Sequence, residues 1–106
     1  MDWQTIKQAV LQLRMVLSEH DVRLDGAILF GSYAKGRATE ESDIDLAIVS
    51  RDFGKDRIAE GVLLNTLMFR IMKNAELVPI SLKDYADPHN ISPLLHEIKT
   101  TGKEII

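Results

Sequence analysis

Residues 31–46 read GSYAKGRATEESDIDL, and this stretch decides the fold. Its Gly-Ser pair directly follows the apolar run 27–30, and a second apolar run begins around the aspartates Asp43 and Asp45. A short apolar run that ends at a glycine is typical of a buried strand. The stretch therefore predicts two buried strands, at 27–30 and 43–49, with a short helix at 32–35 and a polar loop at 36–42 between them.

The sequence on either side predicts three further helices and a third strand. Apolar residues recur at helical spacing over 2–18 and 55–73. A strand is expected at 76–81, and a closing helix begins at Pro93 and stops near Gly102. Pro79 lacks the N–H that a strand ladder needs, so the third strand belongs at a sheet edge or carries a bulge.

This order of elements favours an α/β (α+β) fold, a small mixed sheet with helices packed on one face. A helix joins the second and third strands, which favours a parallel pair that is adjacent or nearly so. The core-facing side chains of the two long helices are expected to be Ile6, Val10, Leu13 and Leu17 in the first, and Ile58, Val62, Leu64, Leu67, Met68 and Ile71 in the second.

Composition limits the class of protein. The 106 residues suit one domain spanning 1–106, and a hydrophobic fraction of 45% supplies a core. The net charge of −3 argues against a broad nucleic-acid surface, because such surfaces are usually basic. The chain has no cysteine, no apolar run near the roughly 20 residues that span a bilayer, and no signal-peptide pattern at its start. We therefore expect a cytoplasmic protein that makes no membrane contact.

Three acidic residues are candidates for a metal site. Asp43 and Asp45 stand two apart on a predicted strand, so both carboxylates project from one face with Cα atoms about 7 Å apart. Carboxylates this close repel each other unless a cation lies between them, and oxygen ligands suit Mg²⁺ or Mn²⁺. Glu76 opens the third strand, and three carboxylates are enough to hold two divalent ions about 4 Å apart. The alternative is a set of solvated surface acids.

Four residues in the same stretch are candidates for binding phosphate. Gly31 lets the backbone turn sharply and approach a ligand closely. If Ser32 opens a helix, free backbone N–H groups and its hydroxyl form an anion site. Lys35 and Arg37 lie in the following loop, where they are able to contact phosphate oxygens. The alternatives are an ordinary strand-to-helix turn with Ser32 as its N-cap, and two solvated loop cations.

Together these motifs resemble the signature of the DNA polymerase beta-like nucleotidyltransferase superfamily. The resemblance rests on Gly31-Ser32, on Ala-Lys-Gly at 34–36 and on Ser-Asp-Ile-Asp-Leu at 42–46. The small size is similar to that of the superfamily's minimal nucleotidyltransferases, the MNT-type domains. Two positions depart from the usual pattern, because Glu76 stands where Asp is frequent and Lys35 where Arg is common.

The resemblance implies a Mg²⁺-dependent enzyme similar to protein adenylyltransferases, which moves AMP from ATP to a hydroxyl group. Gly31 and Ser32 would hold the phosphates, Asp43 and Asp45 would ligate two Mg²⁺ ions, and Glu76 would act as general base or share a metal. Domains of this kind are often paired with a helical HEPN-type toxin, which implies an antitoxin that adenylylates its partner. A homodimer, a non-catalytic binding antitoxin and transfer to a small molecule such as an aminoglycoside are the alternatives.

Overall fold

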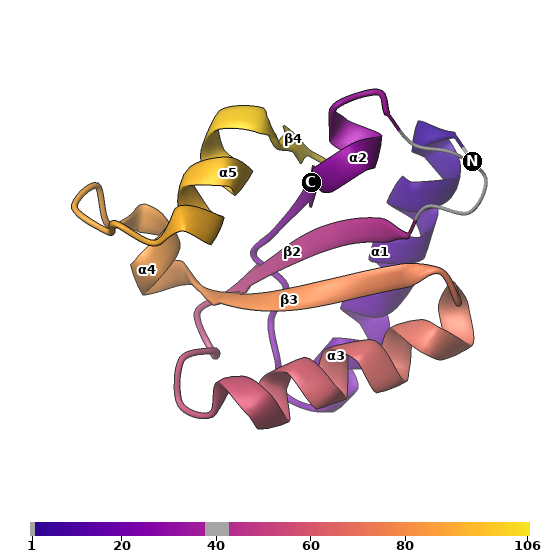
Figure 1. Cartoon of the computed structure of the whole chain (residues 1–106). Coiled ribbons are helices and arrows are strands. Elements are labelled where there is room, and N and C mark those ends of the chain that lie inside the picture. The colour runs from indigo at the N-terminus through magenta and orange to yellow at the C-terminus, as the bar shows by residue number, and fades with distance from the viewer. Residues whose placement is uncertain (1, 38–42) are drawn as a thin grey trace.

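A four-stranded sheet in the order β3-β2-β1-β4 organises the chain (Figure 1). The computed structural model describes residues 2–37 and 43–106, so the loop expected at 36–42 lies mostly outside the described residues. The strands are β1 (Gly26–Phe30), β2 (Ile44–Ser50), β3 (Ala75–Ser81) and β4 (Lys103–Glu104). β1 pairs antiparallel with β2 and β4, and β2 pairs parallel with β3, as the helical connection between them predicts. Pro79 lies on the edge strand β3, which confirms that expectation.

Two long helices cover one face of the sheet, as expected. α1 (Trp3–Glu19) begins after Asp2, whose carboxylate accepts a hydrogen bond from the Thr5 N–H at 2.8 Å. α3 (Arg57–Ile71) lies below the strands in the view of Figure 1. The core under this face includes Ile6, Val10, Leu13, Leu17, Ile44, Leu46, Ile48, Leu64 and Met68. No helix within the described ranges is both long and apolar enough to cross a membrane.

The second face of the sheet is also covered in part, which corrects the expectation of helices on one face only. α5 (Pro93–Thr101) lies on this face, above the strands in Figure 1, and the short α4 (Leu82–Ala86) follows directly on β3. Leu95 and Ile98 of α5 join a second apolar cluster with Ile28, Phe30, Ala47, Val49 and Ile80. The physical reason lies in β2, where residues 46–50 are all buried without alternation. A strand that is apolar on both faces needs other elements to cover both faces.

The apolar face predicted for α3 is only partly correct. Leu64 and Met68 are buried against the sheet, whereas Ile58 is 81% exposed and Val62 is 60% exposed. Ile58 and Leu64 are six residues apart, which is about 240° around a helix, so they cannot face the same layer. The helix therefore carries two apolar sides, and the sheet covers one of them.

Asn65 of α3 closes the outer edge of β3. Its side-chain carbonyl accepts from the Leu77 N–H at 2.9 Å, and its amide nitrogen donates to the Leu77 carbonyl, also at 2.9 Å. The side chain therefore occupies the place that a neighbouring strand would take at this residue. Pro79, two residues further along β3, has no N–H to offer a neighbour.

Two Arg–Asp pairs join the segment before β1 to the turn after β2. The Arg23 guanidinium donates to Asp52 at 3.0 Å, and the Arg51 guanidinium donates to Asp25 at 2.6 Å. In each pair the arginine's own backbone N–H donates to the same carboxylate, at 2.9 Å and 2.8 Å respectively. The hydrogen bond from the Arg23 side chain lowers the pKa of Asp52 to about 2.

Candidate functional site

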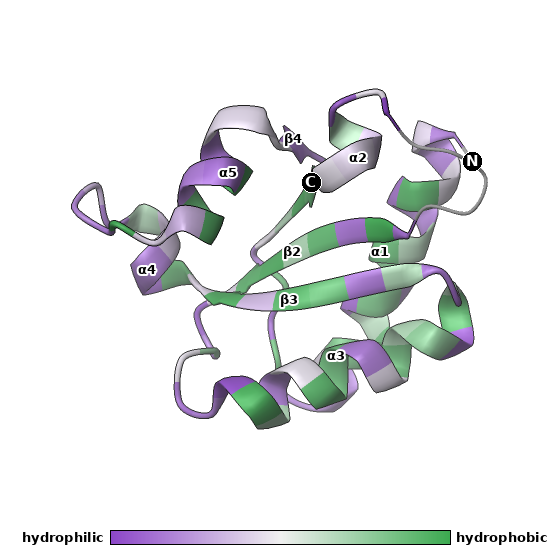
Figure 2. Ribbon diagram, in the orientation of Figure 1, coloured by the Kyte–Doolittle hydropathy of each residue, from purple (hydrophilic) through white to green (hydrophobic). Residues whose placement is uncertain are grey.

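The three predicted acidic residues lie at the same end of the two parallel strands. Asp45 is the second residue of β2 and Glu76 is the second residue of β3, and the two are direct register partners. Neighbouring strands are about 4.8 Å apart, so partners in register project side by side from one face. Asp43 is exposed and lies directly before β2. Figure 2 shows a hydrophilic band near the start of each of these otherwise largely hydrophobic strands.

These carboxylates lie on the face of the sheet opposite α1 and α3. Ile44 and Leu46, the neighbours of Asp45 along β2, are fully buried in the core under α1 and α3. Side chains alternate along a strand, so Asp45 projects to the other face, towards α5. The alternation predicted for the start of this strand is therefore confirmed.

Gly31 lies directly against the Asp45 carboxylate. Its φ is +73°, a conformation that favours glycine, and a Cβ at this position would collide with Oδ2 of Asp45. The preceding residue, Phe30, is the register partner of Asp45 across β1 and β2. The close approach of backbone expected at Gly31 is thus present, and what approaches is a carboxylate of the candidate site.

The other phosphate-binding candidates follow in and just after α2 (Gly31–Ala34). Ser32 is the second residue of this helix, and the N-cap is Phe30, so the alternative of Ser32 as an N-cap is wrong. Lys35 is the C-cap residue. Arg37 is exposed, and its backbone N–H donates to the Ser32 carbonyl at 2.9 Å. The four candidates therefore lie within one segment, 31–37, which begins where Gly31 contacts Asp45.

Asp45 lies in an environment that opposes its ionisation. Burial raises the pKa of the Asp45 carboxyl, and the negative charges of Glu76, Asp43 and Glu97 raise it further. This is the electrostatic signature of carboxylates crowded into a partly buried place, which is frequent at functional sites.

Glu97 is the acidic residue that the sequence reasoning missed. It lies on α5, and its carboxylate accepts from the Lys35 ammonium at 3.0 Å. The contact joins residues 62 positions apart, and no sequence motif links them. Glu97 thus connects a predicted phosphate-binding residue to the acidic end of the sheet.

The acidic side chains do not form a closed metal cage. Among the described residues, no three His, Asp or Glu side chains gather closely enough to hold a metal ion by themselves. Asp43, Asp45 and Glu76 share one end of the sheet as separate oxygen donors, which is the donor type that Mg²⁺ prefers. Burial and charge repulsion raise the pKa of Asp45, and a hard divalent cation would relieve the repulsion.

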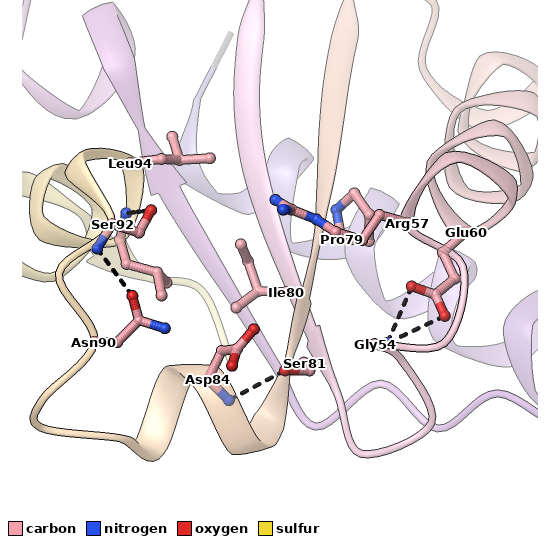
Figure 3. Close-up of a pocket in the computed structure, with 11 residues that line it drawn as sticks. Gly54, Arg57, Glu60, Pro79, Ile80, Ser81, Asp84, Asn90, Ser92 and Leu94 are labelled. Atoms are coloured by element: carbon pink, nitrogen blue, oxygen red, sulfur yellow. Dashed lines mark hydrogen bonds between the residues drawn. The ribbon is translucent and has the colours of Figure 1, made fainter.

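A separate cavity of about 170 Å³ lies at the opposite end of β3 (Figure 3). Its polar lining is largely engaged in local structure. Glu60 accepts from the Gly54 N–H at 3.1 Å, and the Ser81 hydroxyl accepts from the Asp84 N–H at 3.1 Å. The cavity has none of the candidate site residues in its lining, so it is not part of that site.

Comparison with known proteins gives a consistent result. A family model described as polymerase beta, nucleotidyltransferase matches residues 12–106. A relative from Methanocaldococcus jannaschii, named "Putative protein adenylyltransferase MJ1305", is 36% identical over 70 residues, which is 66% of this chain and 40% of the relative. The chain spans about two fifths of the length of the curated relatives it matches.

Two solved structures share the fold. A chain from the crystal structure of a toxin-antitoxin with AMP-PNP is 25% identical, with a TM-score of 0.64 over 94% of this chain and 72% of that chain. A chain from the structure of tri-AMPylated Shewanella oneidensis HEPN toxin in complex with MNT antitoxin is 23% identical, with a TM-score of 0.59 over 99% of this chain and 72% of that chain. The mixed sheet and its helices match this fold, which confirms the predicted fold class.

Proposed function

The chain belongs to the polymerase beta nucleotidyltransferase family, and from that membership we propose that it transfers AMP from ATP to a hydroxyl group on a protein partner. The observation that carries the proposal is the contact of Gly31 with Asp45 together with the register of Asp45 and Glu76. In this arrangement the turn that would bind phosphate lies directly beside the carboxylates that would bind metal. The name of the Methanocaldococcus relative supports a protein as the acceptor.

The segment 31–37 would hold the triphosphate. The backbone of Gly31 and the hydroxyl of Ser32 would bind phosphate oxygens where α2 begins. Lys35 and Arg37 would neutralise the outer phosphates from the loop. Lys35 is already paired with Glu97, so it would exchange one oxygen partner for another when a nucleotide binds.

The carboxylates would hold the metal. Asp43 and Asp45 would ligate Mg²⁺, two ions in all, with Glu76 as a third oxygen donor or as the general base. The raised pKa of Asp45 supports this assignment, because a cation stabilises the ionised form that its surroundings disfavour. Mg²⁺, when bound, neutralises charge on the triphosphate and makes the acceptor hydroxyl more acidic.

The transfer itself needs an in-line attack on the α-phosphorus. The acceptor oxygen forms a bond to that phosphorus, and the bond to the bridging oxygen breaks, so pyrophosphate leaves with the electron pair. The hydroxyl proton goes to a carboxylate, for which Glu76 is exposed and adjacent to Asp45. Most of the rate enhancement in such transfers comes from orientation and charge placement, which is what this end of the sheet would provide.

The partner that we propose is a helical HEPN-type toxin, with this chain as its antitoxin. The support is the fold shared with a chain from an AMPylated HEPN toxin–MNT antitoxin complex. A partner would also supply the acceptor hydroxyl, since the residues that we assign here all serve the nucleotide and the metal.

The test uses this chain, its co-purified helical partner, ATP and Mg²⁺. Intact-mass spectrometry is expected to show that the partner gains the mass of one or more AMP groups, and growth assays are expected to show that the chain relieves toxicity. The double variant Asp43→Asn, Asp45→Asn is expected to lose the mass gain and the protection together.

The matched control is Glu19→Gln with Asp21→Asn, which removes the same two charges at the end of α1. It is expected to transfer AMP like the wild type. Protection that survives in Asp43→Asn, Asp45→Asn would instead identify a non-catalytic binding antitoxin. AMP found on an aminoglycoside, with none on the partner, would identify a small-molecule enzyme.

A further inference from the structure

The outward side of α3 carries a stripe of exposed apolar side chains. Ile58 is 81% exposed, Val62 is 60% exposed and Phe69 is 59% exposed. Their spacing of four and seven residues places them on one side of the helix. We call these three residues the α3 stripe. Apolar residues exposed singly are ordinary, but a row of them on one helix marks a surface that a partner covers.

Two shallow hollows lie along α3 beside the stripe. Lys55, Asp56, Arg57 and Ile58 line the first with Pro79 of β3, and the lining of the second includes Val62, Phe69 and Arg70. Figure 2 shows hydrophobic segments at several places along α3. Each residue of the stripe therefore borders one of the two hollows.

Four cations flank the stripe. Lys55 and Arg57 flank its first end, and Arg70 and Lys73 flank its second end, with the Lys73 ammonium 5.9 Å from the centre of the Phe69 ring. None of these four cations forms a salt bridge with another described residue.

Two acidic residues at the start of α3 offset part of that positive charge. Asp56 accepts from the Ala59 N–H at 3.1 Å, and Glu60 accepts from the Gly54 N–H at 3.1 Å. Both carboxylates keep their negative charge, so the positive charge beside the α3 stripe is concentrated at its second end. In a chain whose net charge is −3, that end is a local basic surface.

We propose that the α3 stripe docks an acidic amphipathic helix of a partner protein. The apolar side of that helix would cover Ile58, Val62 and Phe69, and its flanking carboxylates would pair with the cations at the second end. A second copy of this chain is the competing occupant, and measuring self-association distinguishes it from a partner helix. The inference rests on the proposed function only in assigning the acidic amphipathic helix to the helical partner.

The position of the stripe leaves the acidic site free. α3 packs under the sheet face that holds Ile44 and Leu46, whereas Asp45 projects to the other face. The edge strand β3 lies between them, and it carries Glu76. A partner held at α3 is thus anchored next to the strand that contributes to the site without covering the site.

The test is a binding measurement on the full chain without ATP or Mg²⁺. The probe is a synthetic amphipathic helix with leucines on one side and glutamates on its flanks, and its matched partner has every glutamate replaced by lysine. The acidic peptide is expected to bind at least tenfold more tightly than the basic one, and more weakly as salt is raised. Chemical shifts are expected to change along α3 and not at the acidic end of the sheet.

Variants assign the contact to the stripe. Val62→Glu with Phe69→Glu is expected to weaken binding of the acidic peptide at least tenfold while circular dichroism shows an unchanged fold, because both side chains are mostly exposed. Met15→Glu is the matched control, since Met15 is 71% exposed on α1, and it is expected to bind like the wild type.

Several results would overturn the docking proposal. They are equal binding of the two peptides, no loss in the double stripe variant, self-association of the chain that the stripe variant abolishes, and binding of phosphatidylserine vesicles in preference to the peptide. The Asp43→Asn, Asp45→Asn variant is expected to bind the peptide normally. Peptide binding without AMP transfer would therefore contradict the proposed function and leave the docking surface intact.

Discussion

Replacing Gly31 with alanine tests how closely the phosphate-binding turn is joined to the acidic site. The new Cβ would meet Oδ2 of Asp45, and the backbone would have to keep a φ of +73°. The two effects are separable because Gly36 has nearly the same φ, +71°, and no atom of residues 2–37 or 43–106 lies within 4 Å of the Cβ that alanine would add. Gly36→Ala therefore carries the backbone cost alone.

The structure sets the magnitudes of both effects. Holding alanine in the left-handed region costs about 1–2 kcal/mol. Forcing a methyl group against a packed neighbour adds roughly 1–3 kcal/mol. We expect Gly36→Ala to lose about 1–2 kcal/mol of the free energy of unfolding and Gly31→Ala to lose roughly 2–5 kcal/mol. A displacement of Asp45 by about 1 Å would lower the transfer rate by on the order of 100-fold.

Urea unfolding measures the free energy of unfolding, and AMP transfer to the partner measures the transfer rate. The decisive comparison repeats Gly31→Ala in a chain that also carries Asp45→Ala, because this variant lacks the carboxylate that the new methyl group would contact. In that background the cost of Gly31→Ala should fall to the backbone cost seen in Gly36→Ala. Equal unfolding free energies for the two glycine variants, or an excess cost that persists without the Asp45 carboxylate, would refute the reasoning.

Three further predictions follow from the hydrogen bonds and charges. Asn65→Ala leaves the Leu77 N–H and carbonyl unpaired, so urea unfolding should show a loss of about 1–3 kcal/mol, and an unchanged midpoint would contradict this. The pKa of Asp45 is raised in the folded state, so ionising this carboxyl lowers the stability of the fold as the pH rises through its folded-state pKa. Asp45→Asn removes that cost and should raise the melting temperature at pH 7 in EDTA. The pKa of Asp52 is lowered to about 2, so its contribution to stability is present above pH 3.8 and is lost as the pH falls through about 2. Arg23→Ala should bring the Asp52 pKa back towards 3.8, and a carboxyl NMR titration that shows no rise would disprove the assignment.

Local physical rules made much of the fold predictable. Asp2 caps α1, Pro79 lies on an edge strand, and the helical connection makes β2 and β3 parallel. The same parallel pairing places Glu76 beside Asp45, so the gathering of the acidic residues followed from topology. The family match confirms the recognition that began with residues 31–46. The roles of the individual residues in binding phosphate and metal remain predictions.

The features that could not be predicted depend on long-range packing. α3 is apolar on two sides, and its periodicity alone does not say whether Ile58 or Leu64 faces the sheet. The strand β4 is two residues long and forms only because β1 offers it an edge. Glu97 reaches Lys35 across 62 positions, and that contact exists only because α5 folds back over the second face of the sheet.

The Arg–Asp pairs at the far ends of β1 and β2 bear on how the two strands align at the candidate site. A one-residue slip of β2 against β1 would turn Asp45 into the apolar core and expose Ile44 or Leu46 in its place. Arg23 and Arg51 bind their carboxylates with both backbone and side chain, so each pair is satisfied in one alignment of the strands. We therefore expect substitutions of these arginines or aspartates to disturb the position of Asp45 at the opposite end of the sheet.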